Sequence, residues 1–211
     1  MHISKKEIEA LDRVKRLKII NAVSGIKSAN LIGTINKKAQ TNLAIFSSVV
    51  HIGSDPALLG FMMRPTADVP RNTYNNIMEN ELYTINHVQS SFIKNAHYTS
   101  AKFEESISEF DRCNLSEEFI TDFQAPFVKE STFKMGMKLK ESIHIKSNNS
   151  ILIIGEIEHL ILPDDSMVDN DINLEVANSI GISGLNSYYS LKKVASYPYA
   201  REKEIPNFET H

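Results

Sequence analysis

The sequence contains no tryptophan, a single cysteine and no long apolar run. One cysteine, Cys113, excludes an intramolecular disulfide and is typical of a reducing compartment, or of a periplasmic protein that does not depend on disulfides. The apolar runs ILIIG and LLGFMM have five and six residues, whereas a membrane-spanning helix needs about 20. The first 18 residues are charged throughout and lack the apolar stretch of a secretory signal. We therefore expect a soluble, cytoplasmic protein with no membrane partner.

An excess of one charge is lacking too. The 23 Lys and Arg residues are scattered among 26 Asp and Glu residues, which gives a formal net charge of −3. Domains that bind nucleic acids carry a broad basic field, so we expect no nucleic-acid partner. Hydrophobic residues fill 42% of the 211 positions, which is enough for one domain with a sizeable core.

Several catalytic and cofactor motifs are absent from the sequence. It has no G-x-G-x-x-G after a strand, no Walker A loop and no G-x-S-x-G, which argues against a Rossmann domain, a P-loop and a hydrolase elbow. The seven histidines form no H-x-x-x-H or H-E-x-x-H pair, and Cys113 has no C-x-x-C partner. We therefore expect no metal site built from neighbouring positions.

Hydrophobic periodicity predicts many strands and few helices. Ser4 and Glu7 have capping-box spacing, and Ile8, Leu11 and Val14 follow at helical intervals, so we expect a helix over about 5–21. Short helices are expected over 73–80 and 174–180. Strands are expected over 28–36, 41–52, 57–64 and 81–88, with three more inside 127–162 and a turn at 147–149.

The remaining segments connect these elements. Residues 89–125 are polar and mixed, which is typical of short helices and loops, and the tail over about 190–211 is expected to be irregular and to lie against the surface. No repeat, low-complexity segment or long linker divides the chain. We predict a single domain over 1–211, with its core over about 22–165 and a barrel-like sheet.

Two arginines flank a predicted helix start. Arg64 ends the strand over 57–64, and Arg71 precedes Asn72 and Thr73, where the helix begins. A helix N-terminus offers unpaired N–H groups and partial positive charge, so with two guanidinium groups it would suit a phosphate. The alternative is that Asn72 or Thr73 only caps the helix and that both arginines are solvated.

Polar side chains also occur within the apolar strand predicted over 41–52. Neighbouring residues of a strand point to opposite faces, so one of Ser47 and Ser48 faces inward or towards a groove, together with residues such as Asn42. The alternative is a serine at the surface or bonded to the backbone. Hydroxyl and amide donors on a strand that leads to an anion pocket would suit a phosphorylated heterocycle.

The order and spacing of these segments resemble the flavin reductase-like family, the FMN-binding split barrel. The resemblance covers about residues 10–195, and no single motif carries it. Its segments are Gly33-Thr34, Asn42 to Ser47, Asp55-Pro56, Arg64, Arg71 to Thr73, Asn76-Ile77, Tyr83 to Asn86, His97 to Ser100, ILIIGEIEHL, Leu185 and Tyr188-Tyr189.

The resemblance implies a mainly β fold with peripheral helices, namely a Greek-key-like antiparallel split barrel. It also implies a homodimer that binds FMN at its interface. The FMN phosphate would be held by Arg64, Arg71, Asn72 and Thr73.

The resemblance assigns the ring end of FMN to a different segment. Phe46, Ser47 and Ser48 would line the isoalloxazine, and Asn42 would hold either the strand or the ribityl chain. His97 and Ser100 would approach the ring or the nicotinamide; the alternative for His97 is a surface or capping role.

The activity that the resemblance implies is that of an NAD(P)H-dependent flavin reductase. Hydride would pass from C4 of the nicotinamide to N5 of FMN, and free flavin, oxygen or another molecule would accept the electrons. Both reacting atoms belong to cofactors, so no catalytic side chain is expected. A non-enzymatic FMN electron carrier and a flavin-free interaction module are the alternatives.

Overall fold

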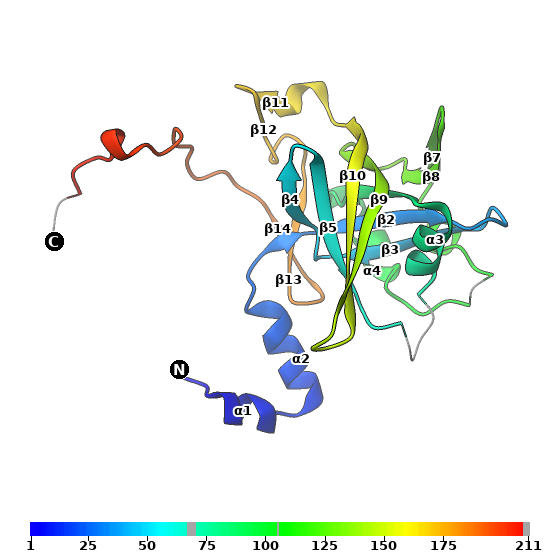
Figure 1. Cartoon of the computed structure of the whole chain (residues 1–211), viewed down its shortest axis with the longest axis horizontal. Helices are drawn as coiled ribbons and strands as arrows, with labels where there is room; N and C mark the ends of the chain where they lie inside the picture. Colours follow the sequence, from blue (N-terminus) through cyan, green and yellow to red (C-terminus); the bar gives the residue numbers. More distant parts are fainter. Residues whose placement is uncertain (67–70, 105, 209–211) are drawn as a thin grey trace.

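A seven-stranded antiparallel sheet is the largest element of the fold (Figure 1). The computed structural model describes residues 1–66, 71–104 and 106–208. The spatial order of the strands is β3-β2-β6-β9-β10-β5-β4, so the expected mainly β fold is confirmed. The strands are β2 (Asn30–Ile35), β3 (Thr41–Phe46), β4 (Val50–Ser54), β5 (Ala57–Met63), β6 (Leu82–His87), β9 (Lys134–Ile145) and β10 (Ser150–Ile161).

The sheet is curled because its two edge strands are consecutive in sequence. β3 ends at Phe46 and β4 begins at Val50, yet these strands occupy opposite edges of the sheet. Four Cα steps span at most about 14 Å, whereas seven strands in a flat sheet would place the edges about 29 Å apart. The sheet therefore bends until its edges approach each other, as the expected barrel requires.

The single strand expected over 41–52 is wrong, because residues 47–49 cross from one edge of the sheet to the other. β3 pairs with β2, and β4 pairs with β5. The apolar pattern continues on both sides of the two serines, which is why periodicity did not reveal the break.

The helix expected over 5–21 is two helices, α1 (Lys5–Ala10) and α2 (Arg13–Ala22). The capping box predicted at the start of α1 is present. The helix breaks because the Asp12 carboxylate accepts hydrogen bonds from the N–H groups of Val14 and Lys15, both at 3.0 Å. Asp12 is thus the N-cap of a new helix and cannot continue the first.

The other strands form small sheets, and the other helices are short. No helix within the three described ranges is both long and apolar enough to cross a membrane. The small sheets pair β1 (Lys27–Ser28), β13 (Ile180–Ser183) and β14 (Ser187–Ser190); β7 (Glu117–Ile120) and β8 (Phe123–Val128); and β11 (Met167–Val168) and β12 (Asp171–Ile172). The helices are α3 (Asn72–Asn80), α4 (Ile93–Tyr98) and α5 (Glu109–Arg112), with 3-10 turns η1 (Ser90–Phe92), η2 (Asp164–Ser166) and η3 (Glu202–Glu204).

Two expectations in the second half of the chain need correction. β7 and part of β8 lie within the segment that was expected to hold only short helices and loops. The helix expected over 174–180 is a turn followed by β13. The Asn173 side chain accepts from the N–H groups of Glu175 and Val176, and Asn178 adopts a φ of 50°, so the chain turns before a helix can form.

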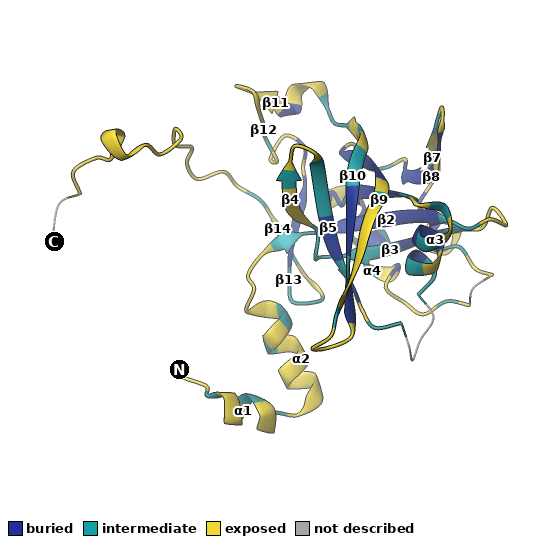
Figure 2. Cartoon of the chain, in the orientation of Figure 1, coloured by how far each residue is buried: buried dark blue, intermediate teal, exposed yellow. Residues whose placement is uncertain are grey.

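The C-terminal tail does not lie against the surface, contrary to expectation. Beyond β14 it leaves the body of the molecule (Figures 1 and 2), and Val194, Tyr197 and Tyr199 are 96%, 86% and 86% exposed. The N-terminal helices are similar, since neither α1 nor α2 has a buried residue.

Apolar side chains pack on both faces of the curled sheet. Inside the curl, Ile32, Phe61 and Ile153 are fully buried in one cluster. On the outer face of β2 and β3, Leu31 and Leu43 belong to a second cluster that also includes residues of α4 and α5. The two faces of β3 therefore meet different parts of the structure.

β8 crosses β2 so closely that only glycine fits at position 33. A Cβ atom on Gly33 would lie inside contact distance of the Pro126 carbonyl oxygen and 2.6 Å from Thr84 Oγ1. These two oxygens are already joined, because the Thr84 hydroxyl donates to Pro126 at 2.7 Å.

We predict that Gly33→Ala destabilises the protein by about 2–3 kcal/mol, because neither a backbone oxygen nor a bonded hydroxyl can move aside without strain. Urea unfolding gives the free energy. The control is Gly53→Ala, where the new Cβ would meet only the Pro56 carbonyl oxygen, at 3.5 Å. Equal stabilities for the two variants would contradict the close approach.

Candidate functional site

The N-terminus of α3 has unpaired backbone donors. Arg71 is the N-cap residue, with a φ of −122°, and within the described residues no side chain caps the helix. Asn72 and Thr73 are the first two helical residues, so the alternative that one of them caps the helix is wrong. No described residue accepts from the first-turn N–H groups of Asn72 and Thr73, which would suit an anion.

The two arginines lie at opposite ends of the loop that joins β5 to α3, and a hydrogen bond brings those ends together. Arg71 Nε donates to the Pro65 carbonyl at 3.4 Å, and Arg64 directly precedes that proline. Neither guanidinium is paired with a carboxylate among the residues that the structure describes. Within the part of the chain that the structure describes, two unpaired guanidinium groups beside an uncapped helix start form a donor set that fits a phosphate.

Buried amide and hydroxyl groups attach α3 to the sheet. Asn42 Nδ2 donates to Thr73 Oγ1 at 3.0 Å, and Asn76 Nδ2 donates to Thr34 Oγ1 at 3.1 Å. All four side chains are at most 6% exposed. Sequence reasoning assigned no role to Thr34 or Asn76, although a threonine in the apolar strand NLIGTI is a signal that could have been used.

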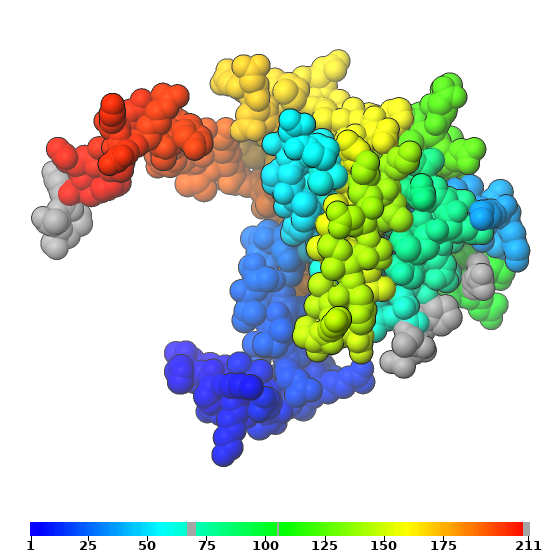
Figure 3. Space-filling model, viewed as in Figure 1, coloured from blue at the N-terminus to red at the C-terminus, as the bar shows by residue number. Residues whose placement is uncertain are grey.

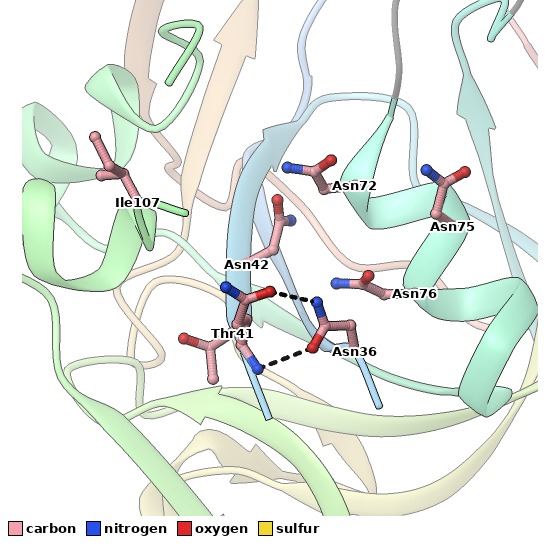
Figure 4. A pocket seen from close by; sticks show the side chains of 8 residues that line it. Asn36, Thr41, Asn42, Asn72, Asn75, Asn76 and Ile107 are labelled. Atoms are coloured by element: carbon pink, nitrogen blue, oxygen red, sulfur yellow. Dashed lines mark hydrogen bonds between the residues drawn. The ribbon is translucent and has the colours of Figure 1, made fainter. Parts of the chain in front are cut away.

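A small polar cavity lies beside these bonds (Figure 4). Figure 4 shows Asn72, Asn75 and Asn76 on α3, Asn42 beside them on β3, and Ile107 on the opposite side. Its volume is about 30 Å³, which is room for two or three water molecules. The cavity is lined by Asn36, Gln40, Thr41, Asn42, Asn72, Asn75, Asn76 and Ile107.

The crossing at 47–49 provides a second set of donors. The Ser48 hydroxyl accepts from Met62 N–H at 3.1 Å and donates to the Met62 carbonyl at 3.4 Å, so this side chain ties the crossing to β5. Within the described residues, the backbone N–H groups of 47–49 donate no hydrogen bond. Three free amides on a half-buried segment fit the acceptor atoms of a heterocycle edge.

Phe46 lies next to this crossing and faces the interior of the curl. Its ring packs edge-on against Phe61 with centroids 5.0 Å apart, and Phe61 packs against Tyr83 at 5.7 Å. Burial raises the pKa of the Tyr83 hydroxyl. Phe46 is only partly buried, so part of its surface remains exposed.

His97 and Ser100 lie at the end of α4, which packs on the opposite face of β3. His97 Nδ1 is 2.9 Å from the Tyr188 hydroxyl, and Ser100 Oγ donates to the His97 carbonyl at 2.7 Å. Asn42 and Thr73 therefore lie together on one face of β3. His97 and Ser100 lie together on the other face, apart from the first pair. The contact between His97 and Tyr188, which are 91 positions apart, was not foreseen.

Glu109 holds the edge strand that carries Asn42. Its carboxylate accepts from Leu43 N–H at 2.9 Å, and the residue is 8% exposed. Burial raises the pKa of this carboxyl, while the hydrogen bond from Leu43 lowers it. α5 thereby covers part of the free edge of β3, which would otherwise offer unpaired donors to another strand.

No group of three or more His, Cys, Asp or Glu side chains within 1–66, 71–104 and 106–208 is arranged to hold a metal ion. The donors at this site are instead guanidinium, amide, hydroxyl and backbone N–H groups. They suit an organic anion with a polar heterocycle.

Comparison with known proteins places this fold and donor set in one class. Residues 24–174 match the flavin reductase like domain, and the chain belongs to this family. Membership supports flavin binding and an oxidoreductase activity. The resemblance seen in the sequence is confirmed.

Individual relatives agree with this class. The chain is 45% identical to a protein assigned as a flavin reductase with split barrel domain from Shewanella frigidimarina NCIMB 400, over 95% of this chain and 100% of that one, with a TM-score of 0.90. Nitrilotriacetate monooxygenase component B from Bacillus cereus shares the fold, at 17% identity and a TM-score of 0.82 over 93% and 98% of the two chains. The uncharacterized protein YwrF of Bacillus subtilis strain 168 is 25% identical over 130 residues, which are 60% of this chain and 63% of that protein. The split barrel fold is thus confirmed.

We predict that Glu109→Gln becomes more stable than the wild type as the pH rises. Glutamine can still accept from Leu43 N–H but has no charge to desolvate. Folding raises the pKa of Glu109 above the ordinary glutamate value of 4.5. As the pH rises from 4.5 through the raised pKa, the free energy of unfolding of the wild type therefore falls relative to that of the variant.

Urea unfolding at about pH 4 and about pH 7 measures this difference. The stabilities should be similar at the lower pH and should differ in favour of the variant at the higher pH. Glu158→Gln, at an exposed position, is the control and should show no such trend. A gap that stays constant with pH would contradict a raised pKa.

Proposed function

We propose that this protein is an FMN-dependent reductase that oxidises NAD(P)H. The proposal rests on one observation: a member of the flavin reductase-like family has two donor sets that no described residue pairs. These are the arginine-flanked start of α3 and the backbone amides at 47–49. When bound, FMN would supply the redox chemistry by accepting a hydride at N5 from the nicotinamide. The released electrons would go to free flavin, oxygen or another small acceptor.

The phosphate of FMN is assigned to the start of α3. Arg64 and Arg71 would give charge-assisted hydrogen bonds, and the N–H groups of Asn72 and Thr73 would add the helix-terminal donors. The Thr73 hydroxyl accepts from Asn42 and keeps its own proton to donate. Asn42 accordingly holds the strand against the helix, which is one of the two roles expected for it.

The isoalloxazine is assigned to the crossing between β3 and β4. The free N–H groups of 47–49 would face N1 and the C2 carbonyl, where reduced flavin gathers negative charge. Phe46 and Ser47 would lie beside the ring, and Ser48 would fix the crossing through Met62. His97 and Ser100 would reach the ring or the nicotinamide around the edge of β3.

The active form is proposed to be a homodimer with FMN at its interface, and the site of action to be the cytoplasm. The single cysteine is free and buried, which suits a reducing compartment. The exposed apolar side chains of α2 and β4 support a protein partner, since Val14, Ile20 and Val50 are 60%, 47% and 50% exposed.

Absorption spectroscopy tests the function. FMN is added to the purified protein, excess is removed, and NADH or NADPH is added without oxygen. A bound flavin band that bleaches with either nicotinamide is the expected result. Bound flavin that neither nicotinamide reduces would favour an electron carrier, and absence of binding would refute a flavin site.

We predict that Arg64→Ala with Arg71→Ala weakens FMN binding at least tenfold, because each charge-assisted hydrogen bond contributes about 1.5–3 kcal/mol. Flavin fluorescence gives the dissociation constant. Riboflavin lacks the phosphate, so its affinity should not change in the same variant. The exposed Arg112 supplies the matched control Arg112→Ala, and an equal loss for FMN and riboflavin would overturn the phosphate assignment.

A further inference from the structure

Helix α2 exposes apolar side chains that no described residue covers. Val14, Leu17 and Ile20 recur at helical spacing and are 60%, 43% and 47% exposed. An isolated helix shorter than about 12–15 residues is marginal in water, and α2 has 10 residues with none buried. Its stability therefore depends on a surface outside its own chain.

The charged residues of α2 all carry the same sign. At 100° per residue, Arg13 lies among the apolar positions, Arg16 and Lys18 flank them, Lys15 lies opposite, and the helix holds no acidic residue. None of these cations forms an ion pair with a residue that the structure describes. The partner surface should thus be both apolar and acidic.

Residues 164–176 have these two properties. This acidic segment runs through η2, β11 and β12 and contains five carboxylates and no Lys or Arg: Asp164, Asp165, Asp169, Asp171 and Glu175. It also exposes four apolar side chains, since Met167, Val168, Leu174 and Val176 are 50%, 43%, 41% and 42% exposed. No ion pair involves its carboxylates within the described ranges.

The two surfaces cannot meet within one chain. Figures 1 and 3 show α2 at the bottom of the molecule and β11 and β12 at its top. β4 lies between them. In a two-fold dimer, if residue i contacts residue j of the partner, j also contacts i. A two-fold axis near β4 would bring each helix to the opposite acidic segment.

We propose that α2 of one copy docks on the acidic segment of a second copy, and that this contact forms twice in a symmetric dimer. The contact lies outside the residues assigned to flavin. It rests on the homodimer proposed above but not on flavin binding. α2 also lies outside residues 24–174, the part matched by the family.

The surface of β4, between α2 and the acidic segment, also favours a second copy of the chain as the partner. β4 is an edge strand with exposed Val50 and Ile52, so the apolar surface continues between the two docking segments.

The Shewanella frigidimarina structure covers 95% of the 211 residues, which leaves out about 11. Because 23 residues precede the family match, some of the residues before position 24 have a counterpart in that structure.

A charge swap tests the contact in the full-length chain. We predict that Arg16→Glu with Lys18→Glu weakens dimerisation at least tenfold, because two attractions become repulsions at each of two sites. Asp165→Lys with Asp169→Lys should weaken it similarly. All four changes in one chain restore complementary charge, so most of the affinity should return. Sedimentation over a dilution series, at low and high salt, gives the dissociation constants.

Lys38→Glu with Lys129→Glu changes the net charge equally at exposed positions outside both segments and should leave dimerisation unchanged. If the α2 substitutions leave the dissociation constant unchanged, or if the four combined substitutions do not restore it, the proposed contact is wrong but the homodimer is not. A chain that sediments at 23.8 kDa at every concentration would overturn the homodimer as well. Flavin absorbance of each variant, recorded separately, reports on the proposed function.

Discussion

The crossing of residues 47–49 between the two edges of the sheet is the constraint on which the rest of the structure depends. Three residues can join the edges only if the sheet curls. The backbone of the crossing residues pairs with neither edge, so their N–H groups have no partner among the residues that the structure describes. The covalent connection that closes the curl therefore also creates the donors of the proposed ring site.

The orientation of α3 depends on directional bonds and not on apolar contact alone. Asn42 with Thr73, and Asn76 with Thr34, join the helix to β3 and β2 while largely excluded from water. Hydrogen bonds require near-linear geometry, whereas apolar packing tolerates small rotations. These two bonds consequently set the direction of the free N–H groups at the start of the helix.

Much of the fold could be predicted from the sequence because most strands carry a clear period. The strands over 28–36, 57–64 and 81–88 are confirmed with small shifts at their ends. The break at Ser47 and Ser48 could not be predicted, because it is imposed by closure of the sheet and not by local preference. The break at Asp12 was readable as an N-cap but was hidden by a continuous helical period.

Some features of the candidate site could also be predicted from the sequence, and others could not. Arg64 follows a predicted strand and Arg71 precedes a predicted helix, and a short loop joins these two elements. The proximity of the two arginines could therefore be predicted. The separation of His97 from Asn42 by β3 could not, because it depends on which face of that strand each helix covers. The partnership of His97 with Tyr188 joins segments 91 positions apart, and local patterns carry no information about it.

The free amides at 47–49 belong to the backbone, and this has an evolutionary consequence. A backbone N–H group survives every substitution except proline, so the side chains at the crossing can drift while the donors persist. Guanidinium groups at the other end of the site are lost with a single codon change. Relatives of this chain should therefore diverge fastest at the crossing and most slowly at the two arginines, and their common ancestry should be easiest to detect from the arginine end.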